Sequence, residues 1–229
     1  MASTISAPSH VGSIDRSVVE RIVRQVALEY LGREKGNRAP VLTVQPSARH
    51  MHVCREDMDV LFGPGSELTV DRPLFQEGFY AAKEMVTIIG PRNRIISNLR
   101  ILGPMRKQSQ VELAFTDAIS LGFDNIPIRI SGDIAGTPGA IIIGPKGVVE
   151  MKQGVIRAGI HVHMNSGEAG YFGVKQGDRM KLRIGGAAGL TFNNVVVRID
   201  PGSKLNVHMD TDEANACGLH LTKEFELFK

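Results

Sequence analysis

The chain has 229 residues, of which 42% are hydrophobic, and 27 basic against 24 acidic residues give a net charge of +3. This mild charge, the absence of Trp and an aromatic content of 5% argue against a nucleic-acid stacking surface. Two cysteines, Cys54 and Cys217, are too few for a disulfide framework, and residues 1–13 lack the apolar stretch of a signal peptide. No apolar run has the length of a membrane span. We therefore expect a soluble protein of a reducing compartment.

The first expected element is an amphipathic helix, which follows a loose polar segment at residues 1–13. Apolar side chains recur at helical spacing from Val18 to Leu31. Gly32 and the Gly36-Asn37 pair are expected to end the helix. Two roles stay open for it: packing on the domain, or binding a partner such as a shell or scaffold protein.

From Pro40 onward the pattern changes to short strand-like segments that are separated by Gly-Pro and other turn signals. Many short strands at this spacing are typical of β-barrels or sandwiches. One short helix each is expected at residues 115–121 and 210–217. The expected strands are 41–45, 49–54, 84–90, 94–101, 110–115, 127–130, 140–143, 148–152, 155–164, 179–184 and 194–199.

Four of the seven histidines form two pairs with one residue between the partners, His50/His52 and His161/His163. Side chains two positions apart on a strand point to the same side, so each pair places two imidazoles next to each other. Such a pair can bind one metal ion, and zinc accepts imidazole nitrogen and carboxylate oxygen. The alternative is that these histidines are structural or solvated.

The surroundings of the two pairs are similar. A Phe-Gly sequence follows each pair, and its glycine lies 13 residues after the first histidine in one copy and 12 in the other. Two similar half-units that bring their histidine strands to a common site would explain this echo, although two short matches can also arise by chance.

A third ligand for each metal must come from elsewhere in the chain. His208 is one candidate and lies near Asp210, Asp212 and Glu213. Glu112 alternates with apolar neighbours along its strand, so it faces either a metal cavity or solvent. Three protein ligands leave an open coordination position, which is typical of a catalytic metal.

Arg106 lies in a Gly-Pro turn before the Glu112 strand and could form two hydrogen bonds to a phosphate, although most basic loops are simply solvated. The glycine-rich segments match neither dinucleotide nor nucleotide phosphate loops, and no GxSxG motif is present. Cys54 is more readily explained as a buried structural thiol than as a nucleophile.

Five segments, taken together and in order, resemble the PduL-type phosphotransacylases, also called phosphate propanoyltransferases. They cover about residues 40–217 and are Ser47–Val53, Ile101–Arg106 with Gln110–Glu112, Pro127–Asp133, Gly154–Met164 and His208–Ala216. The resemblance implies reversible transfer of a short acyl group, propanoyl or acetyl, between coenzyme A and inorganic phosphate.

The resemblance also implies a mainly β fold, with two β-barrel domains of similar topology and a short N-terminal α-helix. Residues 1–35 would form a flexible N-terminus and the amphipathic helix. Residues 36–49 with 159–229 would form the first barrel, and residues 50–158 the second. The helix resembles peptides that target such enzymes to bacterial microcompartments, so shell proteins are expected partners and a microcompartment in the bacterial cytoplasm an expected location. A homo-oligomer is a further expectation.

Carried over position by position, the resemblance implies two metal ions, usually zinc, in a cavity between the barrels. His50, His52 and Glu112 would bind one ion. The other would be bound by His161, His163 and His208. Arg106 would hold the attacking phosphate. The expected contacts of coenzyme A are Ser47, Arg72, Arg100, Leu102, His208 and Asn215.

The chain departs from the family pattern at three positions. Ile160 stands where a basic residue is expected, Glu77 where Pro is expected, and Arg72 where Lys is common. Because all the expected metal ligands are present, these departures bear on substrate range more than on the reaction.

Two other functions are open to a chain with these residues. In a cupin-like metalloenzyme, such as an oxygenase or isomerase, Glu56 and Glu168 would complete the two metal sites, but Arg106 and His208 would have no role. In a non-catalytic scaffold protein of a microcompartment, closed metal sites would only stabilise the fold.

Overall fold

The computed structural model describes residues 16–34 and 39–229. Strands make up 38% of the chain and helices 20%, so the prediction of a mainly β protein is confirmed. The chain divides into two compact units, Met1–Val41 and Leu42–Lys229, and every strand belongs to the second.

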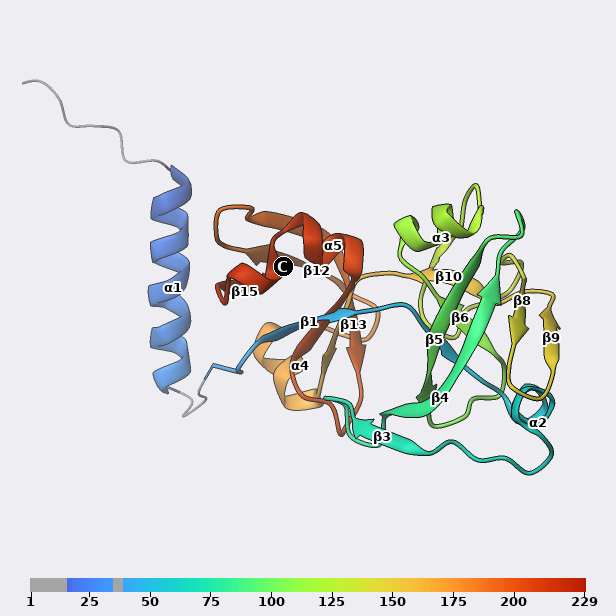
Figure 1. The fold of residues 1–229 in the computed structure, drawn as a ribbon. Helices are drawn as coiled ribbons and strands as arrows, with labels where there is room; N and C mark the ends of the chain where they lie inside the picture. Colours follow the sequence, from blue (N-terminus) through green and yellow to red (C-terminus); the bar gives the residue numbers. More distant parts are fainter. Residues whose placement is uncertain (1–15, 35–38) are drawn as a thin grey trace, which may run out of the picture. The chain divides into compact units, whose positions relative to one another are not determined.

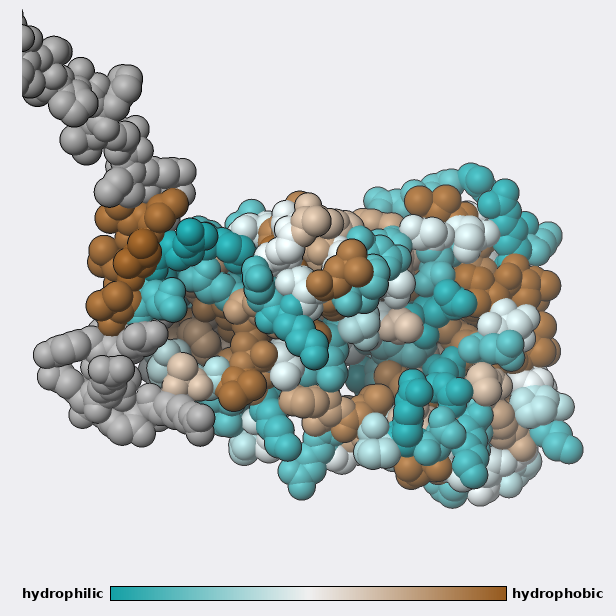
Figure 2. Space-filling model, turned by 60° about the vertical axis from the view of Figure 1, so that its left-hand side comes forward, coloured by the Kyte–Doolittle hydropathy of each residue, from teal (hydrophilic) through white to brown (hydrophobic). Residues whose placement is uncertain are grey.

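The helix of the first unit, α1, runs from Arg16 to Glu34. Gly32 lies inside it, so the prediction that Gly32 ends the helix is wrong: one interior glycine costs only about 1 kcal/mol relative to alanine. The loose segment expected at residues 1–13 lies outside the described residues. No described helix combines the length and hydropathy that crossing a membrane requires. Apolar side chains are exposed on α1, as the brown surface of the helix in Figure 2 shows, and they are Val19, Ile22, Val23 and Val26.

The second unit contains two sheets (Figure 1). One has six strands, in the spatial order β1 (Thr43–Ser47), β14 (Asn206–Asp210), β11 (His161–Met164), β13 (Leu190–Ile199), β12 (Arg179–Ile184) and β15 (Phe225–Phe228). The other has nine, in the order β7 (Ile128–Arg129), β10 (Val155–Ala158), β6 (Gln110–Glu112), β2 (His50–His52), β5 (Ile95–Gly103), β4 (Tyr80–Ile89), β8 (Ala140–Ile143) and β9 (Val148–Met151), with β3 (Val70–Pro73) beside β4.

Both sheets are curled into half-barrels and repeat one topology, as predicted. The series β10-β6-β2-β5-β4-β8 corresponds to β1-β14-β11-β13-β12-β15, with the same alternation of parallel and antiparallel pairs. Short helices follow at matching places: α2 (Arg55–Phe62) and α4 (Ser166–Phe172) after the histidine strands, and α3 (Phe115–Leu121) and α5 (Thr211–Ala216) after β6 and β14. A 3₁₀ turn, η1 (Leu219–Leu221), precedes β15.

The two sheets exchange one strand each. β1 directly precedes β2 in the chain but pairs with β14, whereas β10 directly precedes β11 but pairs with β6. The prediction of one continuous strand at 155–164 is therefore wrong. The chain leaves one sheet after Ala158 and enters the other at His161.

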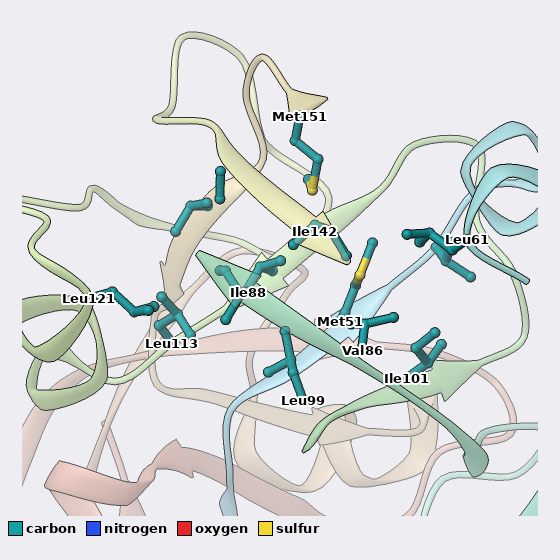
Figure 3. Close-up of a cluster of buried hydrophobic side chains, with 14 of the residues drawn as sticks. Met51, Leu61, Val86, Ile88, Leu99, Ile101, Leu113, Leu121, Ile142 and Met151 are labelled. Carbon is teal, nitrogen blue, oxygen red and sulfur yellow. The ribbon is translucent and has the colours of Figure 1, made fainter. Parts of the chain in front are cut away.

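Each sheet has its own hydrophobic core. Figure 3 shows the core of the nine-stranded sheet, where Met51, Leu99, Ile101 and Leu113 are packed together and almost completely buried. The core of the six-stranded sheet includes Val162, Met164, Val195, Val197 and Val207. Because side chains alternate along a strand, the residues between these core positions lie on the opposite face of each sheet.

Candidate active site

The first cluster of metal-binding side chains is His50, His52 and Glu112, which we call the first triad. Met51 and Val111 face the core, so their strand neighbours in the triad face away from it. His50 is paired with Glu112 across β2 and β6. The Nε2 atom of His50 lies 3.5 Å from the Glu112 carboxylate and 3.2 Å from Nε2 of His52. All three side chains are buried, so Glu112 faces the cavity and not solvent.

The second triad is formed by His161, His163 and His208. His161 is paired with His208 across β11 and β14, in the same register as His50 and Glu112. The ring centroids lie 4.9 to 5.3 Å apart. In each triad, the potential ligand atoms all lie within 4.8 Å of one another.

Backbone carbonyls orient three of the imidazoles. In the tautomer that leaves Nε2 free, Nδ1 of His50 donates to the carbonyl of Ala48 at 2.8 Å, and Nδ1 of His161 donates to that of Gly159 at the same distance. Nδ1 of His52 lies 3.2 Å from the carbonyl oxygen of Leu102. Bonds of this kind direct the other ring nitrogen toward a metal.

Burial keeps most of these imidazoles neutral. It lowers the pKa of His52 to about 3, of His163 to about 2 and of His208 to about 4, and it also lowers the pKa of His161. A neutral imidazole offers the lone pair that a metal requires.

The pair of His50 and Glu112 behaves differently. Burial by itself would lower the pKa of His50, but the Glu112 carboxylate beside it raises that pKa above the usual range. For the carboxylate of Glu112, burial by itself would raise the pKa. The neighbouring His50 outweighs burial and holds this pKa well below the usual range. Glu112 is therefore an ionised ligand at neutral pH.

The two triads share one small pocket. Its walls include Glu112 from the first triad and His161 and His208 from the second, together with Ser47 and Asp210. The Glu112 carboxylate acts electrostatically on both His161 and His208. Three nitrogen ligands on one side, and two nitrogens with a carboxylate on the other, are donor sets that suit zinc and related divalent ions and leave coordination positions open. The side chains of each triad thus fit one metal ion, and the small pocket touches both triads.

Arg106 lies beside the first triad. Its guanidinium donates to the Ser131 hydroxyl at 2.9 Å, and that hydroxyl donates to Glu112 at 2.6 Å. The Gln110 amide also donates to Glu112, at 2.6 Å. Sequence reasoning missed Gln110 and Ser131 as site residues. The position of Gln110, two residues before Glu112 and so on the same face of the strand, could have indicated it.

The residues expected to contact coenzyme A fall into four places. Ser47 and His208 line the small pocket. Arg72 and Leu102 lie in one row across β3, β4 and β5, since both are paired with Ala81, and the row ends beside His52.

The other two expected contacts belong neither to the small pocket nor to the row of Arg72 and Leu102. Arg100, paired with His50 across β5 and β2, donates to the Ala82 carbonyl at 2.6 Å. Asn215 is exposed on α5.

The carboxylates that the cupin-like alternative requires lie elsewhere. Glu168 forms a capping box with Asn165 at the start of α4, and Glu56 is exposed on α2. Asp210 and Glu213 form the capping box of α5. Among the described residues, neither Glu56 nor Glu168 belongs to a metal-binding cluster.

The model of the phosphate propanoyltransferase family matches residues 43–220, a range that includes both triads and Arg106. The chain belongs to the phosphate propanoyltransferase family. The chain is 49% identical to the phosphate propanoyltransferase of Planctopirus limnophila, and the match covers 95% of this chain and 93% of the relative. It is 48% identical to the phosphate propanoyltransferase of Thermotoga maritima, with 80% of this chain and 87% of the relative covered. It is 44% identical to that of Listeria monocytogenes, with 88% of this chain and 89% of the relative covered.

Membership of the phosphate propanoyltransferase family makes the chain an enzyme of the acyltransferase class. The reaction of this family is acyl transfer between an acyl-CoA and phosphate, and coenzyme A as a substrate agrees with the family.

Proposed function

We propose that the enzyme reversibly transfers a short acyl group, propanoyl or acetyl, between coenzyme A and inorganic phosphate with the help of two metal ions, zinc in the first place. The observation that carries this proposal is the meeting of both triads in one pocket, with Arg106 joined to the first triad through Ser131. Bound there, the ions would supply Lewis acidity toward the thioester carbonyl and a ligand position for the thiolate sulfur.

Arg106 would bind and orient the phosphate. A guanidinium can make two parallel hydrogen bonds to phosphate oxygens, and the Ser131 hydroxyl holds this one in place. A phosphate oxygen attacks the carbonyl carbon of the thioester, and the carbon–sulfur bond breaks as coenzyme A leaves as a thiolate. The products are an acyl phosphate and coenzyme A, whose thiolate takes up the proton that the attacking hydrogen phosphate loses.

A covalent acyl-enzyme is not part of this scheme. Cys54 is buried, burial raises the pKa of its thiol, and its sulfur accepts a hydrogen bond from Ser109 at 3.4 Å. These surroundings disfavour a thiolate nucleophile.

Coenzyme A would approach along Ser47, Arg72, Arg100, Leu102, His208 and Asn215. Support comes from Ser47 and His208 in the wall of the pocket and from the row that joins Arg72 and Leu102 to His52. The two arginines would face the phosphates of the nucleotide.

The location and protein partners form a separate part of the proposal. The exposed apolar residues of α1, Val19, Ile22, Val23 and Val26, recur at helical spacing and would bind a microcompartment shell protein in the bacterial cytoplasm. Changing Ile22 and Val26 to Glu in the full chain should abolish co-purification with shell proteins and leave acyl transfer unchanged. Unchanged co-purification would contradict this role of α1.

The proposed reaction is tested by thiol release from propanoyl-CoA or acetyl-CoA, with and without phosphate. Arg106→Ala should reduce the phosphate-dependent rate at least about 100-fold, as loss of a preorganised charge-stabilising donor commonly does. Lys107→Ala is the matched control, because Lys107 is the exposed neighbour in the same turn. Release without phosphate would indicate a thioesterase, and no release by metal-replete protein would contradict the proposed reaction.

A further inference from the structure

A second and larger cleft adjoins the second triad. It shares only Gly159 and His161 with the small pocket. Its walls are strongly basic and contain four arginines and one carboxylate, Glu213; the arginines are Arg129, Arg157, Arg179 and Arg198. Basic walls in a cleft attract anions and raise their local concentration.

Two of the four arginines have carboxylate partners. Arg157 forms ion pairs with Asp210 and Glu213, and Nε of Arg129 lies 3.7 Å from Asp133. Among the residues that the structure describes, neither Arg179 nor Arg198 has an ion pair. The uncompensated positive charge of the cleft therefore lies on Arg179 and Arg198.

The sheet register places these two arginines next to the second triad. Across β11, β13 and β12, Val196 is paired with His161 on one side and with Arg179 on the other. Arg198 is paired with His163. Paired residues share a face of the sheet, so both guanidinium groups lie on the face that carries the second triad.

Each triad has one guanidinium group beside it. Arg106 is joined to Glu112 of the first triad through Ser131, and Arg198 is paired with His163 of the second triad. The two guanidinium groups repel each other, since the positive charge of Arg198 contributes to a lowered pKa of Arg106, behind the larger effect of burial. An anion between them would offset their repulsion, and phosphate has the geometry to bridge both.

The other half of the repeated fold has no arginine at the positions that correspond to Arg179 and Arg198, although Arg100 stands where the six-stranded half has Val196. Matching the strand pairs of the two sheets shows which residues correspond. In the nine-stranded sheet, Met85 occupies the position of Arg179, and Leu102 occupies the position of Arg198. The repeat even keeps an asparagine in a left-handed conformation at the corresponding strand irregularity, Asn98 in one sheet and Asn194 in the other. The two halves therefore share their backbone, but only the six-stranded half has arginines at these two positions.

We propose that this arginine cleft is a separate entrance for inorganic phosphate, and the exit for acyl phosphate, with Arg179 at its exposed mouth and Arg198 relaying the anion to Arg106. This inference rests on the proposed function. Coenzyme A and phosphate would then reach the triads from different openings, so neither substrate blocks the other.

The test compares Arg179→Gln with Arg183→Gln. Both arginines lie on β12, and both substitutions remove one positive charge. Arg183, however, forms an ion pair with Glu226 at 2.7 Å and lies outside the cleft. In Arg179→Gln we expect the KM for phosphate to rise roughly threefold to tenfold, as loss of one ordinary hydrogen-bonding partner at an exposed position implies, with the KM for acyl-CoA unchanged. Arg179→Glu should have a larger effect, and Arg183→Gln should match the wild type.

Binding of inorganic phosphate, followed by ³¹P NMR titration of the metal-loaded protein without acyl-CoA, gives a readout apart from turnover. We expect weaker phosphate binding in Arg179→Gln and Arg198→Gln, and wild-type binding in Arg183→Gln. A raised KM for acyl-CoA with unchanged phosphate binding would overturn the inference and assign the cleft to coenzyme A.

The two levels of the proposal fail separately. If the wild type releases thiol in a phosphate-dependent manner but the Arg179 variants bind phosphate normally, the cleft inference is wrong and the proposed reaction stands. If the wild type shows no such release but binds phosphate through Arg179, the proposed reaction is wrong and the cleft is still an anion site.

Discussion

Burial determines the protonation of the triad histidines, and this has a measurable effect on stability. Unfolded, each histidine titrates near its ordinary pKa of about 6.5. Folded and without metal, His52, His163 and His208 titrate at about 3, 2 and 4. Between these values the unfolded chain binds more protons, so these groups stabilise the fold above about pH 6.5 and lose that contribution as the pH falls.

We therefore predict that the metal-free protein unfolds at lower urea concentration at pH 5 than at pH 7.5. His50 acts in the opposite direction, since its pKa is raised, but it is one group against four. Urea titrations in a chelator would measure the effect. A variant with His161, His163 and His208 all changed to Asn should show a smaller difference between the two pH values, and an unchanged difference would contradict the assignment.

Residue spacing predicted much of the site. The alternation of side chains along a strand was enough to predict that each histidine pair lies on one face. The same alternation left open whether Glu112 faces the cavity or solvent, and the burial of its carboxylate shows that it faces the cavity. What spacing could not supply is the contact of Ser131 with both Glu112 and Arg106, because Ser131 comes from a distant loop. A hydroxyl in a loop carries no periodic signal.

Elements were predicted best where local chemistry defines them. The helix expected at 115–121 is α3, which ends at Gly122 in a left-handed conformation that favours glycine. The helices α2 and α4 were missed because each is a short segment directly after a histidine strand. The strands β3, β14 and β15 were also missed, since their few residues become strands through pairing with distant neighbours.

One ion-pair cluster joins elements of the two sheets. Arg157 on β10 contacts Asp210 and Glu213 at the start of α5, all three are largely buried, and its guanidinium also lies over the Phe115 ring at 4.3 Å. Removing it leaves two buried carboxylates without a cationic partner, so Arg157→Ala should lower the free energy of unfolding by about 3–5 kcal/mol.

Arg92→Ala is the control for that measurement. Arg92 pairs with Asp124, but the two side chains are 58% and 84% exposed, so its loss should cost less than about 1 kcal/mol. Urea unfolding of both variants gives the comparison. Equal effects would show that Arg157 does not join the sheets energetically.

At the scale of the molecule, the six-stranded sheet depends on β1, which is separated in the chain from its other strands by all the strands of the nine-stranded sheet. The family resemblance implied this division, but the local pattern could not supply it, because Gly159-Ile160 and Ala48-Arg49 give no sign of which sheet the following strand enters. Pairing partners are set by the complete core and not by local propensity.

The proposed division of the chain into barrels makes a prediction about fragments. Residues 159–229 alone lack β1 and leave the edge of β14 unpaired, which favours aggregation. The same fragment with residues 39–49 fused through a flexible Gly/Ser linker should be soluble and unfold cooperatively. A fusion with the scrambled 39–49 sequence is the control, and equal behaviour of both fusions would contradict the division.

The central claim is that the two triads hold two metal ions on which acyl transfer depends. The most direct test is the metal content per chain, measured by elemental analysis, for the wild type, Glu112→Ala and His208→Ala, together with thiol release. We predict two ions in the wild type and about one in each variant, with phosphate-dependent thiol release lost in both. Metal content that does not change with the triads, or full activity in metal-free protein, would contradict the account.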